Sequence, residues 1–198
     1  MLQSLAMTDE GDRSPSPRPL APAGPILVVA GIGLAAVVGL VLSLFFDPGL
    51  PAHLSDSYMR VAGGLVSPST HTAAADALSA QLASQPPGAV RVPSLDAIGY
   101  RLAGGGHVTL GGRPAALAIY RNTLQDLVVW HAAAGDVASW PATTDVRDQE
   151  GRRFYVHHKA TTIIAAWQEG GLAASITSAL PADHVMAIAR AAAAGARP

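Results

Sequence analysis

The sequence predicts an α+β protein in which a single N-terminal transmembrane helix precedes an antiparallel-sheet domain with one or two packing helices. Three observations lead to this fold class. Residues 25–46 form one apolar run without a charged side chain. The later part of the chain contains short segments of strand composition that are separated by glycine-rich gaps. The last of these is followed by a segment whose apolar residues recur with helical spacing.

Composition narrows the class of protein. The 198 residues are 49% hydrophobic and 14% charged, with 13 basic and 14 acidic side chains. Disordered chains are poor in apolar residues and rich in charge, and nucleic-acid-binding proteins carry a basic surface for the phosphates. Both classes are therefore excluded. Cysteine is absent, which excludes disulfides, thiol catalysis and metal sites built on cysteine.

The apolar run of residues 25–46 is long enough to cross a bilayer. As a helix it extends roughly 33 Å, against a hydrocarbon core of about 30 Å. A cleaved signal peptide is the alternative, but residues 1–24 precede the run, which is also longer than a signal core. Arg13 and Arg18 precede the run and Arg60 follows it. This asymmetry favours a cytoplasmic N-terminus.

Small residues mark one face of the predicted membrane helix. Gly31, Ala35 and Gly39 follow one another at four-residue spacing. Such faces allow a second helix to approach closely, so these three residues are candidates for helix packing with a partner or a second copy. The alternative is that glycine and alanine are simply common in membrane helices.

The remaining segments follow from local composition. Residues 1–24 have no apolar period and predict a flexible cytoplasmic tail. Residues 47–69 are rich in proline, glycine and serine and predict a linker. Residues 70–195 hold the folded domain, which begins with a short helix on which Ala74, Leu78 and Leu82 share a face.

Seven strand-like segments and a final helix complete the predicted domain. The gaps between most strands have hairpin length, which favours an antiparallel meander with turns at Gly104 to Gly106 and at Gly111 and Gly112. The last helix begins near Pro181. The predicted strands are residues 98–102, 107–110, 115–121, 127–131, 154–158, 161–167 and 172–177.

A search for chemistry finds no catalytic or cofactor motif. The chain has no P-loop, no dinucleotide fingerprint, no zinc-protease motif and no nucleophile elbow, so we expect no enzyme and no cofactor. The candidate metal ligands are the seven histidines, His53, His71, His107, His131, His157, His158 and His184. Of these, His107, His131 and one of His157 and His158 can converge across a sheet. Trp140 lies on a long loop and is a candidate exposed anchor for a protein partner.

Several short motifs follow one another along the C-terminal domain. They are Gly99-Tyr100-Arg101-Leu102, Arg113-Pro114-Ala115-Ala116, Ile119-Tyr120-Arg121, Trp167-Gln168-Glu169-Gly170-Gly171-Leu172 and Leu180-Pro181-Ala182-Asp183, preceded by His71 and by Val92-Pro93-Ser94-Leu95. In this order the motifs resemble the periplasmic domain of proteobacterial transmembrane anti-sigma factors, over roughly residues 56–195. The resemblance implies a non-enzymatic protein-interaction domain outside the bacterial inner membrane.

The cytoplasmic part departs from that family. Anti-sigma factors of this kind commonly hold the sigma factor with a zinc-binding helical domain of histidine and cysteine, whereas this chain has only residues 1–24 before the apolar run and no cysteine. A zinc-dependent sigma clamp is therefore not expected, and a sigma factor is only weakly supported as a partner.

Three functions stay open at this point. The first is an inner-membrane protein with an anti-sigma-like periplasmic interaction domain, either a regulator or a relic of one. The second is a structural accessory subunit of a larger respiratory or photosynthetic membrane complex, favoured by the missing sigma clamp and by the small-residue helix face. The third is a periplasmic metal-binding or enzymatic domain, which only the histidines support.

Overall fold

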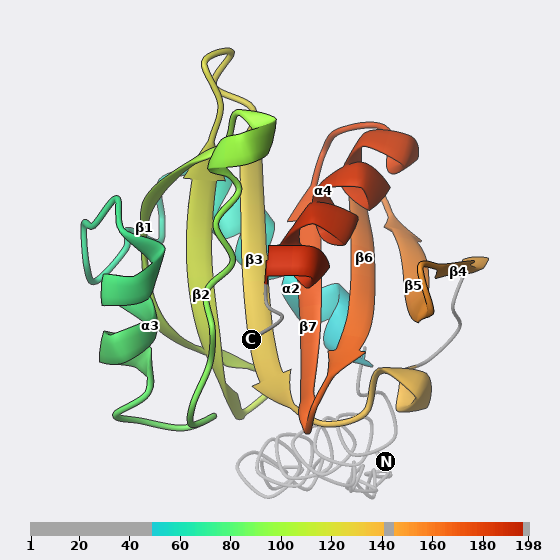
Figure 1. Ribbon diagram of the computed structural model, residues 1–198, viewed down its shortest axis with the longest axis horizontal. Coiled ribbons are helices and arrows are strands. Elements are labelled where there is room, and N and C mark those ends of the chain that lie inside the picture. The colour runs from blue at the N-terminus through green and yellow to red at the C-terminus, as the bar shows by residue number, and fades with distance from the viewer. Residues whose placement is uncertain (1–48, 141–144, 196–198) are drawn as a thin grey trace, which may run out of the picture. The chain divides into compact units, whose positions relative to one another are not determined.

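Strands paired edge to edge form the centre of the described structure. The computed structural model describes residues 49–140 and 145–195. The chain divides into two units, Met1–Phe46 and Asp47–Pro198, and every described residue belongs to the second. Its seven strands form one antiparallel sheet in the order β1-β2-β3-β7-β6-β5-β4 (Figure 1). They are β1 Arg101–Leu110, β2 Arg113–Arg121, β3 Leu127–Ala134, β4 Asp145–Gln149, β5 Arg152–Lys159, β6 Thr162–Glu169 and β7 Leu172–Ser178.

The sheet consists of two meanders rather than the single meander that the sequence predicts. Strands β1 to β3 follow one another by hairpins, and so do β4 to β7. The chain leaves β3 through the 3₁₀ turn η2, Val137–Ser139, and re-enters the sheet at β4, on the far edge. The two meanders join where β3 pairs with β7, with His131 opposite Ser175. This places His131 near the middle of the sheet.

Helices cover both faces of the sheet. On one face, α4 (Ala182–Gly195) packs on β6 and β7, and α3 (Ala75–Leu82) packs beside β1 (Figure 1). On the other face lies α2 (Gly49–Ala62), which contacts β1, β3, β5, β6 and β7. Successive side chains of a strand point to opposite faces of the sheet, so each strand contributes apolar side chains to the core on both faces. Ala165 belongs to the α4 side of the core, whereas Ile164 belongs to the α2 side.

The last helix confirms the prediction made from its apolar stripe. Helix α4 buries Val185, Ile188, Ala189 and Ala192, as the helical spacing predicts. Helix α3 likewise buries Leu78 and Leu82.

Helix α2 occupies the segment for which the sequence predicts a linker, residues 47–69. Its buried side chains include Leu54, Tyr58 and Val61, at helical spacings of four and three. Pro51 stands in the first turn, where its missing N–H is not needed, and Arg60 stands in the last turn, next to the negative end of the helix dipole. The prediction of a linker was wrong because it weighed the prolines and glycines of this segment above the helical spacing of its apolar residues.

Three consecutive glycines lie inside a strand instead of at a predicted turn. Gly104, Gly105 and Gly106 all belong to β1, so two predicted strands are one. Thr70 pairs with Gly105 through both backbone hydrogen bonds, Gly105 N–H to Thr70 O at 3.0 Å and Thr70 N–H to Gly105 O at 3.1 Å. A Cβ on Gly105 would meet the Leu117 carbonyl oxygen and a methyl of Leu78. The glycines therefore serve close packing.

The predicted fold class is corrected accordingly. The described chain is an α+β domain of a seven-stranded antiparallel sheet with three α-helices, one more than the largest number expected. No helix among its described residues is long and apolar enough to cross a membrane. Residues 25–46, for which the sequence predicts the transmembrane helix, lie outside the described residues.

Candidate functional site

One buried pair in the described structure has the residue types of a hydrolase dyad. Ser57 of α2 and His131 of β3 approach to 2.9 Å between Oγ and Nε2. Both are buried, and His131 is 1% exposed. Its Nδ1 atom has no hydrogen-bond partner among the described residues, so no carboxylate orients the ring. Desolvation by burial lowers the pKa of His131 to about 3, so the ring is neutral at neutral pH.

The Ser57–His131 pair is better suited to holding α2 than to catalysis. A general base must reach the proton of a substrate, and this imidazole is enclosed between helix and sheet. Two further hydrogen bonds lie along the same helix. Ser55 bonds Thr162 at 2.8 Å between the hydroxyl oxygens, and the Tyr58 hydroxyl accepts from the Ala179 N–H at 3.3 Å. Together these contacts fix the helix on the strands.

The candidate metal ligands do not converge. His107 lies opposite Ala116, on the side of the sheet that faces α3 and α4, whereas His131 lies on the α2 side. The neighbours His157 and His158 point to opposite faces, and only His157 is buried. In the part of the chain that the structure describes, no group of three side chains is placed to hold a metal ion.

Trp140 is not the exposed anchor that the sequence predicts. Its side chain is only 9% exposed and belongs to the α2-side core, together with Leu54. Its ring lies 5.8 Å from the His157 ring, centroid to centroid. Truncating Trp140 would disturb this core, so it is not a clean probe of a partner surface. The other predicted packing residues, Gly31, Ala35 and Gly39, lie outside the described residues.

The most exposed large apolar side chain in the described residues is Leu124, at the tip of the β2–β3 hairpin. It is 80% exposed. The turn around it is fixed, because the Asp126 N–H donates to Asn122 Oδ1 at 2.9 Å and Asn122 Nδ2 donates to the Asp126 carboxylate at 2.8 Å. Figure 1 shows this hairpin projecting beyond the sheet, at the same end as the 3₁₀ turn η1 (Asp96–Ile98). A rigid turn thus presents leucine to solvent.

An apolar cleft lies on one side of the hairpin tip. Its volume is about 350 Å³. Exposed Ile98 stands at its edge, and Asp126 gives it a carboxylate. Burial and the nearby Asp126 charge raise the pKa of the Tyr100 hydroxyl, which keeps this phenol protonated. The lining residues are Ile98, Tyr100, Asn122, Asp126, Leu180, His184, Ala187 and Ile188.

A second cleft, on the other side of the hairpin, is basic. It also measures about 350 Å³. Arg101 of β1 and Arg121 of β2 are directly opposite in the register, so their side chains leave the same face of the sheet. Neither guanidinium forms an ion pair with a described residue. The lining residues are Gly99, Arg101, Leu102, Ala103, Arg121, Asn122, Thr123 and Gln125.

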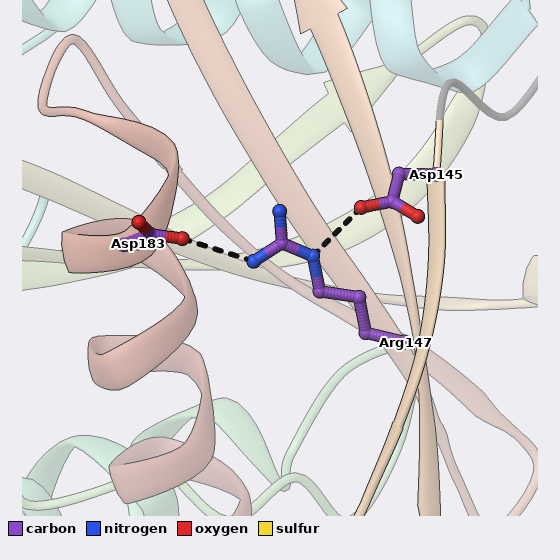
Figure 2. A network of polar contacts seen from close by, with 3 residues as sticks. All are labelled: Asp145, Arg147 and Asp183. Carbon is purple, nitrogen blue, oxygen red and sulfur yellow. Dashed lines mark hydrogen bonds and ion pairs between the residues drawn. The ribbon is translucent and has the colours of Figure 1, made fainter.

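Two arginines at the opposite edge of the sheet are paired with carboxylates. Arg147 of β4 donates to Asp145 at 2.7 Å and to Asp183 of α4 at 3.0 Å (Figure 2). Arg153 pairs with Asp148 at 3.0 Å. These contacts raise the pKa of Arg147, because both carboxylates favour its charged form. Arg147 and Arg153 therefore have carboxylate partners, which Arg101 and Arg121 lack among the described residues.

Comparison with protein-family models, with curated proteins and with solved structures finds no match for this chain.

We call the surface formed by Leu124, Ile98 and the two clefts the hairpin surface. Sequence reasoning missed it and placed the candidate anchor at Trp140. One signal was present in the sequence: Leu124 is an apolar residue between Asn122 and Asp126, in a gap that already has hairpin length. An apolar residue at a hairpin tip has no core to enter, and beside an apolar cleft it is a candidate for an external contact.

Proposed function

We propose that the described domain is a non-enzymatic protein-binding domain and that the hairpin surface is where its partner docks. The observation that carries this proposal is the exposure of Leu124 on a hydrogen-bonded turn between two clefts. Contiguous apolar surface with a polar rim is typical of protein interfaces, and the cleft beside the Leu124 turn adds Ile98, Leu180 and Ile188 to this surface. The enclosed Ser57–His131 pair supports a role without catalysis.

The resemblance to anti-sigma periplasmic domains suggests the setting. It favours a regulatory protein, or a relic of one, that meets its partner outside the bacterial inner membrane. This setting stays a prediction.

Capture of partners by the full chain tests the proposal. The tagged chain is expressed at its native level, and the membrane and soluble fractions are taken through mild detergent, captured and read by mass spectrometry. We expect Leu124→Ser, alone or with Ile98→Ser, to reduce recovery of the partner about tenfold or more, since losing an anchor at an interface costs over about 1.4 kcal/mol. The substitution should leave thermal stability within about 0.5 kcal/mol, because the site is exposed.

Val146→Ser is the matched control. Val146 is also an exposed apolar residue, at 48%, but it belongs to β4 on the far edge of the sheet. Equal recovery of the same partner by the wild-type protein and the Leu124→Ser variant contradicts the proposal. A captured sigma factor or other regulator favours the anti-sigma resemblance, whereas respiratory or photosynthetic subunits favour the accessory-subunit alternative. Recovery of the chain only from the soluble fraction contradicts the predicted membrane setting.

A further inference from the structure

The basic cleft indicates which kind of partner segment binds at the hairpin surface. We infer that the cleft beside Arg101 and Arg121 binds an acidic, extended segment of the partner protein, which adds to the sheet along the free part of β1. This inference rests on the proposed function and specifies its ligand.

Arg101 and Arg121 carry positive charge that no described carboxylate balances. Like charges directly opposite each other on neighbouring strands destabilise a sheet, and no described carboxylate relieves the Arg101–Arg121 pair. Arg121 Nη1 reaches only the Gln125 carbonyl oxygen, at 3.4 Å. Elsewhere in the domain, Arg147 stands between two carboxylates (Figure 2). The two guanidinium groups are therefore complementary to carboxylates from another molecule.

Strand β1 also leaves part of its outer edge open. β1 is the outermost strand of its meander and pairs within the sheet with β2 alone. On its outer side, among the described residues, the one backbone bridge joins Gly105 to Thr70. The stretch from Arg101 to Ala103 is not bridged in this way, and it forms the wall of the basic cleft together with Gly99. An exposed strand edge is a template for an added strand.

The unpaired charge and the open edge specify one geometry. A strand laid along β1 places alternate side chains on the face that Arg101 and Arg121 share. Because the two arginines stand in one row across the sheet, the glutamate or aspartate of the added strand that lies opposite Arg101 would face both guanidinium groups, and the strand backbone would pair with the edge of β1. Arg147 and Arg153, near the β4 edge, lack this property, because carboxylates already neutralise them.

Binding of defined peptides to the full chain tests the inference. The probe is an end-blocked octapeptide that alternates glutamate with threonine, labelled for fluorescence anisotropy, and its twin carries glutamine in place of glutamate. At low salt, we expect the glutamate peptide to bind about tenfold or more tightly than the twin. We also expect slower backbone hydrogen exchange across residues 99–104, which binding through side chains alone would not produce.

Charge variants identify the site. The double variant Arg101→Gln with Arg121→Gln should abolish the preference for glutamate. The double variant Arg113→Gln with Arg190→Gln removes the same net charge at exposed positions elsewhere and should retain it. Preservation of the preference in the first variant overturns the inference. Equal binding of both peptides to the wild-type protein, no binding of either, or unchanged exchange across residues 99–104 also overturns it. Binding to phosphatidylglycerol vesicles that depends on Arg101 and Arg121 would assign the site to a lipid surface instead.

Failure of this inference and failure of the proposed function are distinguishable. If Leu124→Ser loses the native partner while the Arg101→Gln with Arg121→Gln variant keeps it, the protein-binding function stands and the acidic segment is wrong. If Leu124→Ser keeps the partner, the proposed function fails at this surface, whatever the peptides show.

Discussion

His131 is the residue whose chemistry burial changes most. The imidazole lies beneath α2, bonded to Ser57 through Nε2 and without a described partner at Nδ1. A second proton would put a positive charge in a site with no described counter-ion. Because water is excluded, the neutral ring is strongly favoured, and the pKa falls from 6.5 to about 3. The same burial that removes His131 from catalysis makes the docking of α2 sensitive to acid.

The first prediction concerns pH. Between about pH 6.5 and pH 3 the unfolded chain binds a proton at position 131 more readily than the native protein does. Stability from this residue is therefore complete above pH 6.5 and decreases as the pH falls, by at most about 1.4 kcal/mol per pH unit and about 4–5 kcal/mol in total.

Urea denaturation of the full chain at several pH values checks this, with His131→Gln as the comparison. The variant removes the titrating group, so its deficit in stability at pH 7 should shrink steadily toward pH 4. A deficit that is the same at every pH would contradict the assigned pKa.

At the scale of elements, β1 shows why a glycine run need not be a turn. Gly105 stands where the Leu117 carbonyl and the Leu78 side chain approach from either side. Any side chain there would separate β1 from the neighbours that pack on it. Turn propensity and close packing favour the same residue type, so composition alone does not distinguish them.

The second prediction follows from this packing. Gly105→Ala should destabilise the domain by about 1–3 kcal/mol, because the added methyl overlaps backbone that cannot move without moving β2. Gly171→Ala is the matched control: nothing lies within 4 Å of a Cβ placed there. Thermal denaturation of both variants measures the difference. Equal melting temperatures would show that β1 can yield at Gly105.

On the scale of the whole molecule, stability depends on both layers that flank the sheet. Helix α2 connects distant strands, since it contacts both β1 and β5. Leu54 is its fully buried apolar side chain and packs against Ile164 and Ala166 of β6. Loss of packing at Leu54 therefore destabilises both meanders.

The third prediction measures that dependence. Leu54→Ala should lower the free energy of unfolding by about 2–5 kcal/mol, as expected for a cavity in a packed core. Met59→Ala on the same helix, at a side chain that is 52% exposed, should change it by no more than about 0.5 kcal/mol. Comparable losses in urea denaturation would mean that α2 does not form part of the core.

Local patterns in the sequence determined much of the domain by themselves. The stripe of α4, the buried face of α3 and the opposite directions of His157 and His158 follow from periods of 3.6 and 2 residues. The antiparallel pairing follows from gaps of hairpin length. None of these needs knowledge of distant contacts. Residues 25–46, for which a local pattern predicts a membrane helix, lie outside the described residues.

Only the tertiary structure decided the rest. Four features depend on residues far apart in the chain. They are the pairing of β3 with β7, the close packing at Gly105, the burial of Trp140 with the exposure of Leu124, and the position of Arg101 opposite Arg121. Burial and charge pairing are properties of neighbours in space. Those neighbours are fixed only when the two meanders close into one sheet, with α2 on one face and α3 and α4 on the other.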